Sequence, residues 1–276
     1  MKTICKPEKS IDVFIQCANS IKENDKKTRL IGCKDIVNSY VLQYCESKTS
    51  DLIHTISTHS EIKGVNGIVS KKEMQWLYKN TLLNKSKAEL REYYDKILAS
   101  AYHGKCCYCG ENDAVSVDHY LPKSKYPVFA VILINLLPTC SDCNSKQKKD
   151  HEINSENEAL FHPYYDEWDE EEWLVASVTT DDKRDLSNLL FKYDVVKPEN
   201  WSDLLYERVK FHFDKFKLGL LYSKKAKEHL NDTGFLYEKL NEAGKLNSTL
   251  QNEIDKKDHK NSYLSAMYRA LIDFEI

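Results

Sequence analysis

The sequence predicts an α+β chain with a compact, cysteine-containing centre between two mostly helical segments. Five of the nine cysteines lie between Cys106 and Cys143. On both sides of this stretch, apolar residues recur at the three- and four-residue spacing of amphipathic helices. We therefore expect three parts: a mostly helical N-terminal segment over residues 1–69, a central region over 70–166, and a mostly helical C-terminal segment over 167–276.

The composition is that of a folded protein. The chain has 276 residues, 41% of them hydrophobic and 17 of them tyrosine. This content excludes a disordered chain, and the length is enough to bury a substantial core. The formal net charge is only -3. Any affinity for nucleic acid must therefore come from a local site and not from the overall charge.

The cysteines are expected to be reduced. Residues 1–17 contain no continuous apolar stretch of the kind that marks a secretory signal. The longest apolar run, Val128–Ile134, has seven residues, far fewer than the roughly 20 that cross a bilayer. We expect a cytoplasmic protein without membrane association, and in that compartment clustered cysteines indicate metal ligands more than disulfides.

Three helices are predicted before the cysteines, over Asp35–Cys45, Lys71–Asn80 and Ser86–Tyr102. Ser70 and Glu73 have the spacing of a capping box, which places a helix start at residue 71. Two glycines between Glu61 and Val69 predict a loop. A short strand is expected at Ala114–Val117.

The C-terminal segment is expected to be mostly helical after one strand. β-branched residues predict that strand at Trp173–Thr180. An apolar stripe from Leu205 to Leu220 predicts a charged amphipathic helix. A further helix is expected over Tyr263–Phe274.

Two Cys-x-x-Cys pairs form the first chemical motif, Cys106 with Cys109 and Cys140 with Cys143. Each pair can present two thiolates to one ion, and four sulfur ligands satisfy tetrahedral zinc. We expect a structural Zn²⁺ site, with buried free cysteines as the alternative. Cys107, inside the first pair, is not expected to be a ligand.

Polar residues between and beside the cysteines form the second motif. Asp118 and His119 follow the predicted strand, Asn135 comes sixteen residues after the histidine, and Asn144 directly follows the last cysteine. An Asp-His dipeptide alone is more often an exposed surface pair without a catalytic role. This ordered combination between two cysteine pairs has no simple structural explanation.

The combined pattern C-x-x-C, D-H-x-x-P, N-L, C-x-x-C-N resembles the HNH nuclease family and its ββα-metal fold. The match covers about residues 105–149, the core of the central region. The resemblance implies that His119 is the general base, that Asn135 orients the loop and the base, and that Asp118 and Asn144 bind the catalytic metal. This is a D-H-N-N variant of the family pattern.

These residue types suit phosphodiester hydrolysis on chemical grounds. A neutral imidazole can accept a proton from water near neutral pH. Two oxygen ligands favour Mg²⁺ or Mn²⁺ over zinc. The family commonly has a phosphate-binding lysine three residues after the last ligand, where this chain has Gln147. Either neighbouring lysine, Lys146 or Lys148, could substitute for that lysine. We assign phosphate contact to Lys146 and note Lys123 and Lys125 as further candidates.

The segment around His162 resembles one that follows the core in a bacterial subgroup of HNH proteins. We expect His162 near the active site, and a packing role is the alternative. The subgroup is similar to the HNH components of Septu-type (PtuB-like) anti-phage systems. That resemblance implies a nuclease effector that cleaves nucleic acid, with DNA favoured and tRNA or other RNA open.

The same resemblance implies a separate ATPase partner, because this chain has no nucleotide-binding loop. The competing interpretation is a non-catalytic zinc-knuckle subunit that binds nucleic acid or protein. It accounts for the cysteines but leaves Asp118, His119 and Asn144 without a role.

Overall fold

A computed structural model describes residues 2–7, 10–47, 50–180, 189–256 and 260–274 of the chain. It contains two compact units, Thr3–Asp166 and Glu167–Ile276 together with Met1–Lys2. None of the helices in these described ranges is long and apolar enough to cross a membrane. Helices and small two-stranded sheets make up both units, which is compatible with the predicted α+β class.

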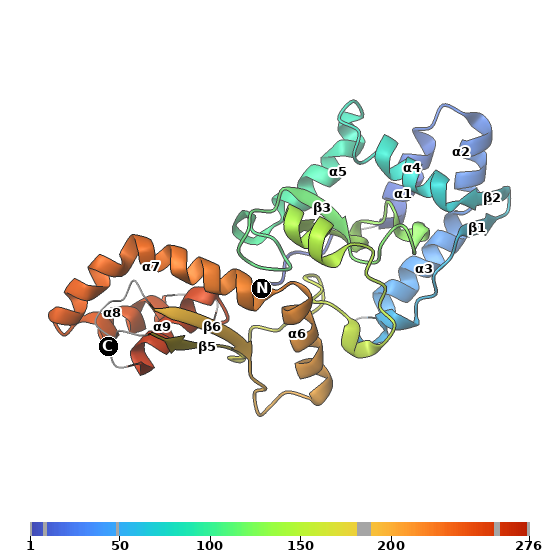
Figure 1. The fold of residues 1–276 in the computed structure, drawn as a ribbon. Coiled ribbons are helices and arrows are strands. Elements are labelled where there is room, and N and C mark those ends of the chain that lie inside the picture. Colours follow the sequence, from blue (N-terminus) through green and yellow to red (C-terminus); the bar gives the residue numbers. More distant parts are fainter. Residues whose placement is uncertain (1, 8–9, 48–49, 181–188, 257–259, 275–276) are drawn as a thin grey trace. The chain divides into compact units, whose positions relative to one another are not determined.

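The first unit begins with helices and continues into short elements (Figure 1). Its α-helices are α1 (Ser10–Asn19), α2 (Asn24–Ile31), α3 (Lys34–Glu46), α4 (Lys71–Asn80) and α5 (Ala88–Ala99). Its strands are β1 (Glu61–Gly64), β2 (Gly67–Ser70), β3 (Ser116–His119) and β4 (Leu136–Thr139). Short 3₁₀ segments are η1 (Ser50–Thr55), η2 (Tyr102–Gly104), η3 (Pro127–Phe129), η4 (Leu133–Asn135) and η6 (Glu156–Glu158), and η5 (Asp142–Lys148) is π-helical. The division expected between residues 69 and 70 falls within β2.

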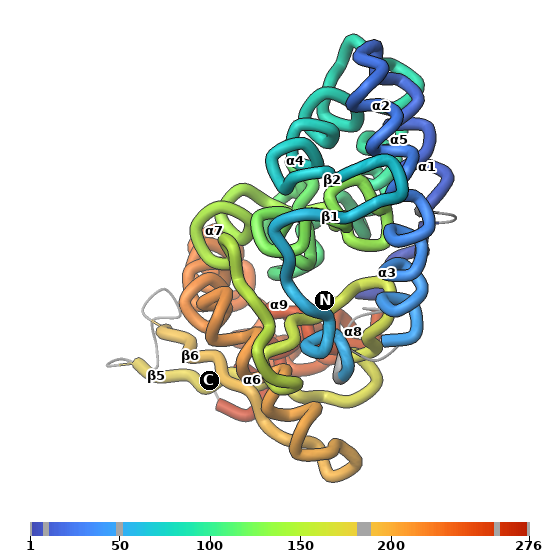
Figure 2. The backbone as a smooth tube through the Cα atoms, turned by 90° about the vertical axis from the view of Figure 1, so that its right-hand side faces the viewer, coloured from blue at the N-terminus to red at the C-terminus, as the bar shows by residue number. Residues whose placement is uncertain are grey.

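The N-terminal helices confirm part of the predicted pattern. Helix α3 matches the helix predicted over Asp35–Cys45 and buries Val37, Val41 and Tyr44. Its buried face results from the three- and four-residue spacing of these side chains. Figure 2 shows the β1–β2 hairpin beside these helices.

The loop predicted at Glu61–Val69 is wrong, because β1 and β2 pair there as an antiparallel hairpin. The two glycines that suggested a loop flank its tight turn. A Cβ on Gly64 would lie 2.6 Å from Cys33 Sγ, so this glycine permits close packing against the preceding helices. Gly67 has a φ of +119°, which favours glycine.

Helix α4 begins where the capping box predicted. The Ser70 hydroxyl accepts a hydrogen bond from the Glu73 backbone N–H, and the Glu73 side chain accepts one from the Ser70 N–H. Helix α5 is shorter than predicted, and the chain leaves it through His103, whose φ is +49°. That left-handed residue redirects the backbone toward the first cysteine pair.

Strands β3 and β4 form the small antiparallel sheet of the central region, with Asp118 opposite Leu137 and His119 opposite Leu136. Strand β3 lies two residues later than predicted. Helix α5 packs against this sheet, and its Tyr94 hydroxyl accepts a hydrogen bond from the Val117 N–H at 3.3 Å. The sheet thus positions Asp118 and His119 within the strand.

The second unit contains β5 (Leu174–Thr179), β6 (Leu190–Val195), α6 (Asp203–Lys215), α7 (Leu218–Glu242), α8 (Leu246–Asp255) and α9 (Tyr263–Asp273). Strands β5 and β6 pair antiparallel, α7 packs on β6 and α9 on β5 (Figure 1). The expectation of a mostly helical continuation after one strand did not include β6.

The apolar stripe from Leu205 to Leu220 does not belong to one helix. Lys217, with a φ of +52°, separates α6 from α7. Leu220 is 58% exposed and contributes little to the core. The helical period was correct within α6, but it could not reveal a left-handed break.

Candidate functional site

Four cysteine sulfurs come together in the first unit. The Sγ atoms of Cys106, Cys109, Cys140 and Cys143 all lie within 4.8 Å of one another, and all four residues are buried. This donor set fits zinc, since ligands at about 2.3 Å around a tetrahedral ion have sulfur atoms about 4 Å apart. The buried four-cysteine cluster could therefore hold zinc.

The backbone around each cysteine pair is arranged as a tight turn. Gly110, with a φ of +73°, donates its N–H to the Cys106 carbonyl at 2.8 Å. Cys140 Sγ accepts the backbone N–H of Cys143 at 3.4 Å and lies 3.9 Å from the Asn112 amide nitrogen. Such N–H groups orient the sulfur and stabilise its thiolate form.

The four thiols of the cluster share protons unequally. The pKa values of Cys140 and Cys109 are lowered by hydrogen bonds from neighbouring thiols, whereas burial raises the pKa of Cys106 and hydrogen bonds within the cluster raise that of Cys143. Hydrogen bonds from Cys106, Cys109 and Cys143 hold the pKa of Cys140 well below its usual range. Cys107 belongs to a different environment. Burial raises the pKa of the Cys107 thiol well above its usual value, and its N–H donates to the Pro138 carbonyl at 3.1 Å.

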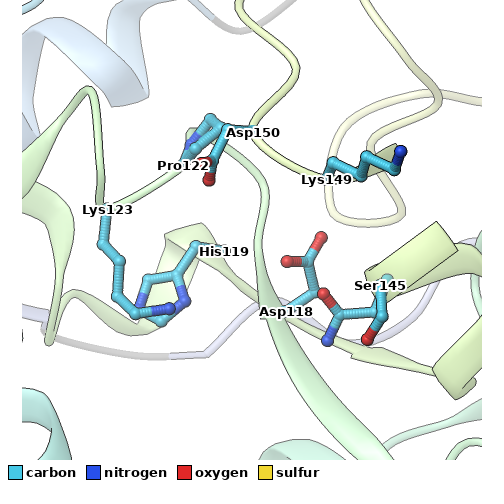
Figure 3. A pocket seen from close by; sticks show the side chains of 8 residues that line it. Asp118, His119, Pro122, Lys123, Ser145, Lys149 and Asp150 are labelled. Atoms are coloured by element: carbon cyan, nitrogen blue, oxygen red, sulfur yellow. The ribbon is translucent and has the colours of Figure 1, made fainter. Parts of the chain in front are cut away.

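A pocket of about 220 Å³ lies where the end of β3 meets η5. Figure 3 shows its lining side chains. They are Asp118, His119, Pro122, Lys123, Asn144, Ser145, Lys149 and Asp150. Three of the predicted site residues, Asp118, His119 and Asn144, therefore line one pocket although they come from two separate segments.

His119 is held in one orientation by the protein. Its Nε2 lies 2.9 Å from the Ala130 carbonyl oxygen, so Nε2 is the protonated nitrogen and Nδ1 is the acceptor. Burial, and then the positive charge of Lys123, lower the pKa of His119 well below its usual value. The Tyr78 ring from α4 packs edge-on at 4.5 Å between ring centres. The imidazole is therefore neutral near pH 7.

Asp118 makes two contacts inside the protein through the same carboxylate oxygen. Its Oδ2 accepts a hydrogen bond from the Tyr108 hydroxyl at 3.1 Å and forms an ion pair with Lys148 Nζ at 3.0 Å. Lys148 is fully buried, and its Nζ also donates to the His119 carbonyl at 2.8 Å. Oδ1 is not engaged in these contacts.

The two asparagines have different surroundings. Asn135 is fully buried and lies outside the pocket lining; its Oδ1 accepts the Leu121 N–H at 2.7 Å, and its amide donates to the Leu121 carbonyl at 3.0 Å. It thereby fastens the chain just after His119. Asn144 donates from Nδ2 to the Ser116 hydroxyl at 3.3 Å, so its carbonyl oxygen is left for a ligand.

Two other predicted residues do not line the pocket. Lys146 is exposed and pairs with Asp142 at 2.6 Å. His162 is buried, with Nε2 2.8 Å from the Tyr44 hydroxyl and its ring centre 4.3 Å from that of Tyr120. These contacts match the packing alternative for His162.

Sequence reasoning missed Lys149 and did not foresee that Tyr108 and Lys148 contact Asp118; it offers Lys148 only as the alternative to Lys146 for phosphate contact. The sequence signal was ambiguous, because in an α-helix Gln147 and Lys148, three and four residues after Asn144, would both lie on the same face as Asn144. In the structure η5 is π-helical, and Lys148 is the residue whose ammonium lies against Asp118, at 3.0 Å from Oδ2.

Two known proteins are similar to parts of this chain. Protein ea31 of Escherichia phage lambda is 33% identical over 171 residues, 61% of this chain and 55% of that protein. Septu protein PtuB of Bacillus thuringiensis is 36% identical over 81 residues, 28% of this chain and 30% of PtuB. The aligned part of the chain spans about half the length of the first relative and less than a third of the second.

No protein-family model matches the chain, and no solved structure matches it. The chain thus has a weak similarity to PtuB and a buried four-cysteine cluster, and this combination fits a Septu-like protein.

Proposed function

We propose that this protein is a metal-dependent HNH endonuclease with a ββα-metal core made of β3, β4 and η5. The observation that carries the proposal is the convergence of Asp118, His119 and Asn144 on one pocket. A carboxylate, a neutral imidazole and an amide oxygen are the groups that metal-assisted phosphodiester hydrolysis needs.

His119 is the general base in this proposal. With Nε2–H donated to the Ala130 carbonyl, Nδ1 has the lone pair that removes a proton from the attacking water. The depressed pKa keeps this lone pair available at neutral pH. Asn135 acts indirectly, because its amide fixes the backbone of Leu121, two residues after the base.

Asp118 and Asn144 are the proposed ligands of a divalent cation. Asp118 Oδ1 and the Asn144 carbonyl oxygen remain for a ligand after the contacts made by Oδ2 and by the amide nitrogen. This hard oxygen donor set fits Mg²⁺ or Mn²⁺. When bound, the cation supplies electrostatic stabilisation of the charge that develops on the phosphate.

The similarity to PtuB supports a role in a Septu-type anti-phage system. We propose that the protein is the nuclease effector of such a system and acts with a separate ATPase subunit. DNA is the favoured substrate, and tRNA or other RNA is tested beside it.

The direct test is a cleavage assay. Wild-type protein, His119→Ala and His103→Asn are incubated with plasmid, single-stranded DNA and tRNA in Mg²⁺ or Mn²⁺. We expect metal-dependent cleavage by wild type and by His103→Asn, which removes a histidine outside the pocket and suits a left-handed backbone. His119→Ala should not cleave, although its melting temperature stays close to that of wild type.

Equal cleavage by wild type and His119→Ala would refute the assigned base. Nucleic-acid binding without cleavage under any of these conditions, with the ATPase partner also present, would favour the non-catalytic zinc-knuckle alternative.

A further inference from the structure

We infer that Lys123 and Lys149 form the anion seat that holds a backbone phosphodiester of the substrate beside Asp118 and His119. The inference rests on the proposed function, and it replaces the sequence-based assignment of phosphate contact to Lys146. Most lysines of residues 105–149 already form an ion pair with a carboxylate, whereas these two do not in the part of the chain that the structure describes.

Residues 105–149 contain six lysines. Four of them form ion pairs with nearby carboxylates: Lys105 with Asp113, Lys125 with Glu152, Lys146 with Asp142, and Lys148 with Asp118. Within the described residues, Lys123 and Lys149 have no carboxylate within ion-pair distance. These two are also the lysines that line the pocket.

Lys123 approaches the pocket from the loop after β3. Burial lowers its pKa, and its ammonium lies 5.5 Å from the centre of the Tyr78 ring. The same ring packs on His119, so the Tyr78 side chain contacts both the proposed base and the Lys123 ammonium. A partly buried ammonium without an ionic partner gains strongly from a bound anion.

Lys149 approaches from the end of η5. Its φ is +52°, an unfavourable conformation for a lysine, and its backbone N–H donates to the backbone carbonyl oxygen of Asn144 at 3.0 Å. The preceding Lys148 is anchored on Asp118. This anchoring and the hydrogen bond fix the backbone that directs Lys149 to the pocket, with its side chain exposed.

The arrangement of charge favours an anion over a second cation at this seat. In Figure 3, Lys123 lies beside the His119 imidazole and Lys149 lies on the other side of the Asp118 carboxylate. Asp118 is already paired with buried Lys148. The ammonium groups of Lys123, Lys148 and Lys149 therefore outnumber the carboxylates of Asp118 and Asp150 in and behind the pocket. A phosphodiester between the two lysines would lie next to the proposed base.

The test measures binding in a His119→Ala background, where cleavage does not interfere. Fluorescence anisotropy gives the affinity for a labelled short DNA duplex, with tRNA in parallel, over a range of salt concentrations. We expect Lys123→Ala and Lys149→Ala each to reduce the salt slope by about one and to weaken binding about eightfold at 0.1 M salt.

Lys105→Ala is the matched control, because it removes the same charge from a lysine that is ion-paired and outside the pocket. Its effect should be much smaller. Lys146→Ala tests the competing assignment and should behave like Lys105→Ala. Thermal unfolding of each variant checks that the fold is retained.

The inference is overturned if Lys123→Ala and Lys149→Ala weaken binding no more than Lys105→Ala, if Lys146→Ala has the larger effect, or if neither nucleic acid binds. The readout is independent of catalysis. Loss of affinity in the two pocket variants, together with a wild-type protein that never cleaves, would therefore support the seat and refute the nuclease.

Discussion

Replacement of Lys148 by methionine is the most informative perturbation of the site. Methionine has nearly the same length as the lysine stem but no ammonium group. In the variant, Asp118 keeps the hydrogen bond from Tyr108 and loses its only ion pair among the described residues. We expect severe destabilisation of the first unit, even though one side chain changes.

The magnitude follows from the geometry of the pair. At 3.0 Å between Lys148 Nζ and Asp118 Oδ2, an effective dielectric constant of about 20 gives an attraction of about 5.5 kcal/mol. Both groups are buried, with Asp118 only 7% exposed. Removing one partner of a buried pair costs about 3–5 kcal/mol, because the other charge stays buried. This is a large part of the roughly 5–15 kcal/mol that stabilises a typical domain.

The assay is a double-mutant cycle by thermal and denaturant unfolding, using Lys148→Met, Asp118→Asn and the double variant. Asparagine can still accept the Tyr108 hydrogen bond but has no charge to leave unpaired. We expect the double variant to recover at least about 2 kcal/mol relative to additivity. Zinc content should stay unchanged in all three proteins, which separates this effect from loss of the four-cysteine site.

Two results would refute this reasoning. A loss of less than about 1 kcal/mol in Lys148→Met would mean that the ion pair contributes little, as surface pairs do. Additive effects in the double variant would mean that Lys148 and Asp118 are not coupled.

Three further predictions concern the metal, the pH and a helix cap. Cys140→Ser should lower zinc from about one equivalent per chain and destabilise the first unit, whereas Cys107→Ser should keep the zinc; equal zinc in both variants would contradict the four-cysteine assignment. Because the folded-state pKa of His119 is depressed, its contribution to stability is complete above about pH 6.5 and is lost as the pH falls toward the folded-state pKa. His119→Gln should flatten that part of the pH–stability curve, and an unchanged curve would exclude His119 as its source. Ser70→Ala should cost about 1 kcal/mol in unfolding free energy, with Ser70→Asp as the cap-preserving control.

Local features of the structure agree best with the sequence. Helix α3 and the start of α4 were predictable, because helical periodicity and capping depend on residues three or four apart. The β1–β2 hairpin was missed because glycines occur both in irregular loops and beside tight hairpin turns, so Gly64 and Gly67 did not distinguish the two. The break at Lys217 was missed because a lysine gives no local signal for a left-handed conformation.

The candidate site shows the same division. The spacing of the four cysteines was sufficient to predict that their sulfurs lie together, and the motif around them singled out Asp118, His119 and Asn144. Packing alone settles which lysine is buried against Asp118, which lysines have no carboxylate partner among the described residues, and that His162 packs against Tyr44. These choices depend on contacts between residues about 30 to 120 positions apart, formed when η5 folds against β3 and the segment around His162 packs on α3. No short-range pattern encodes them.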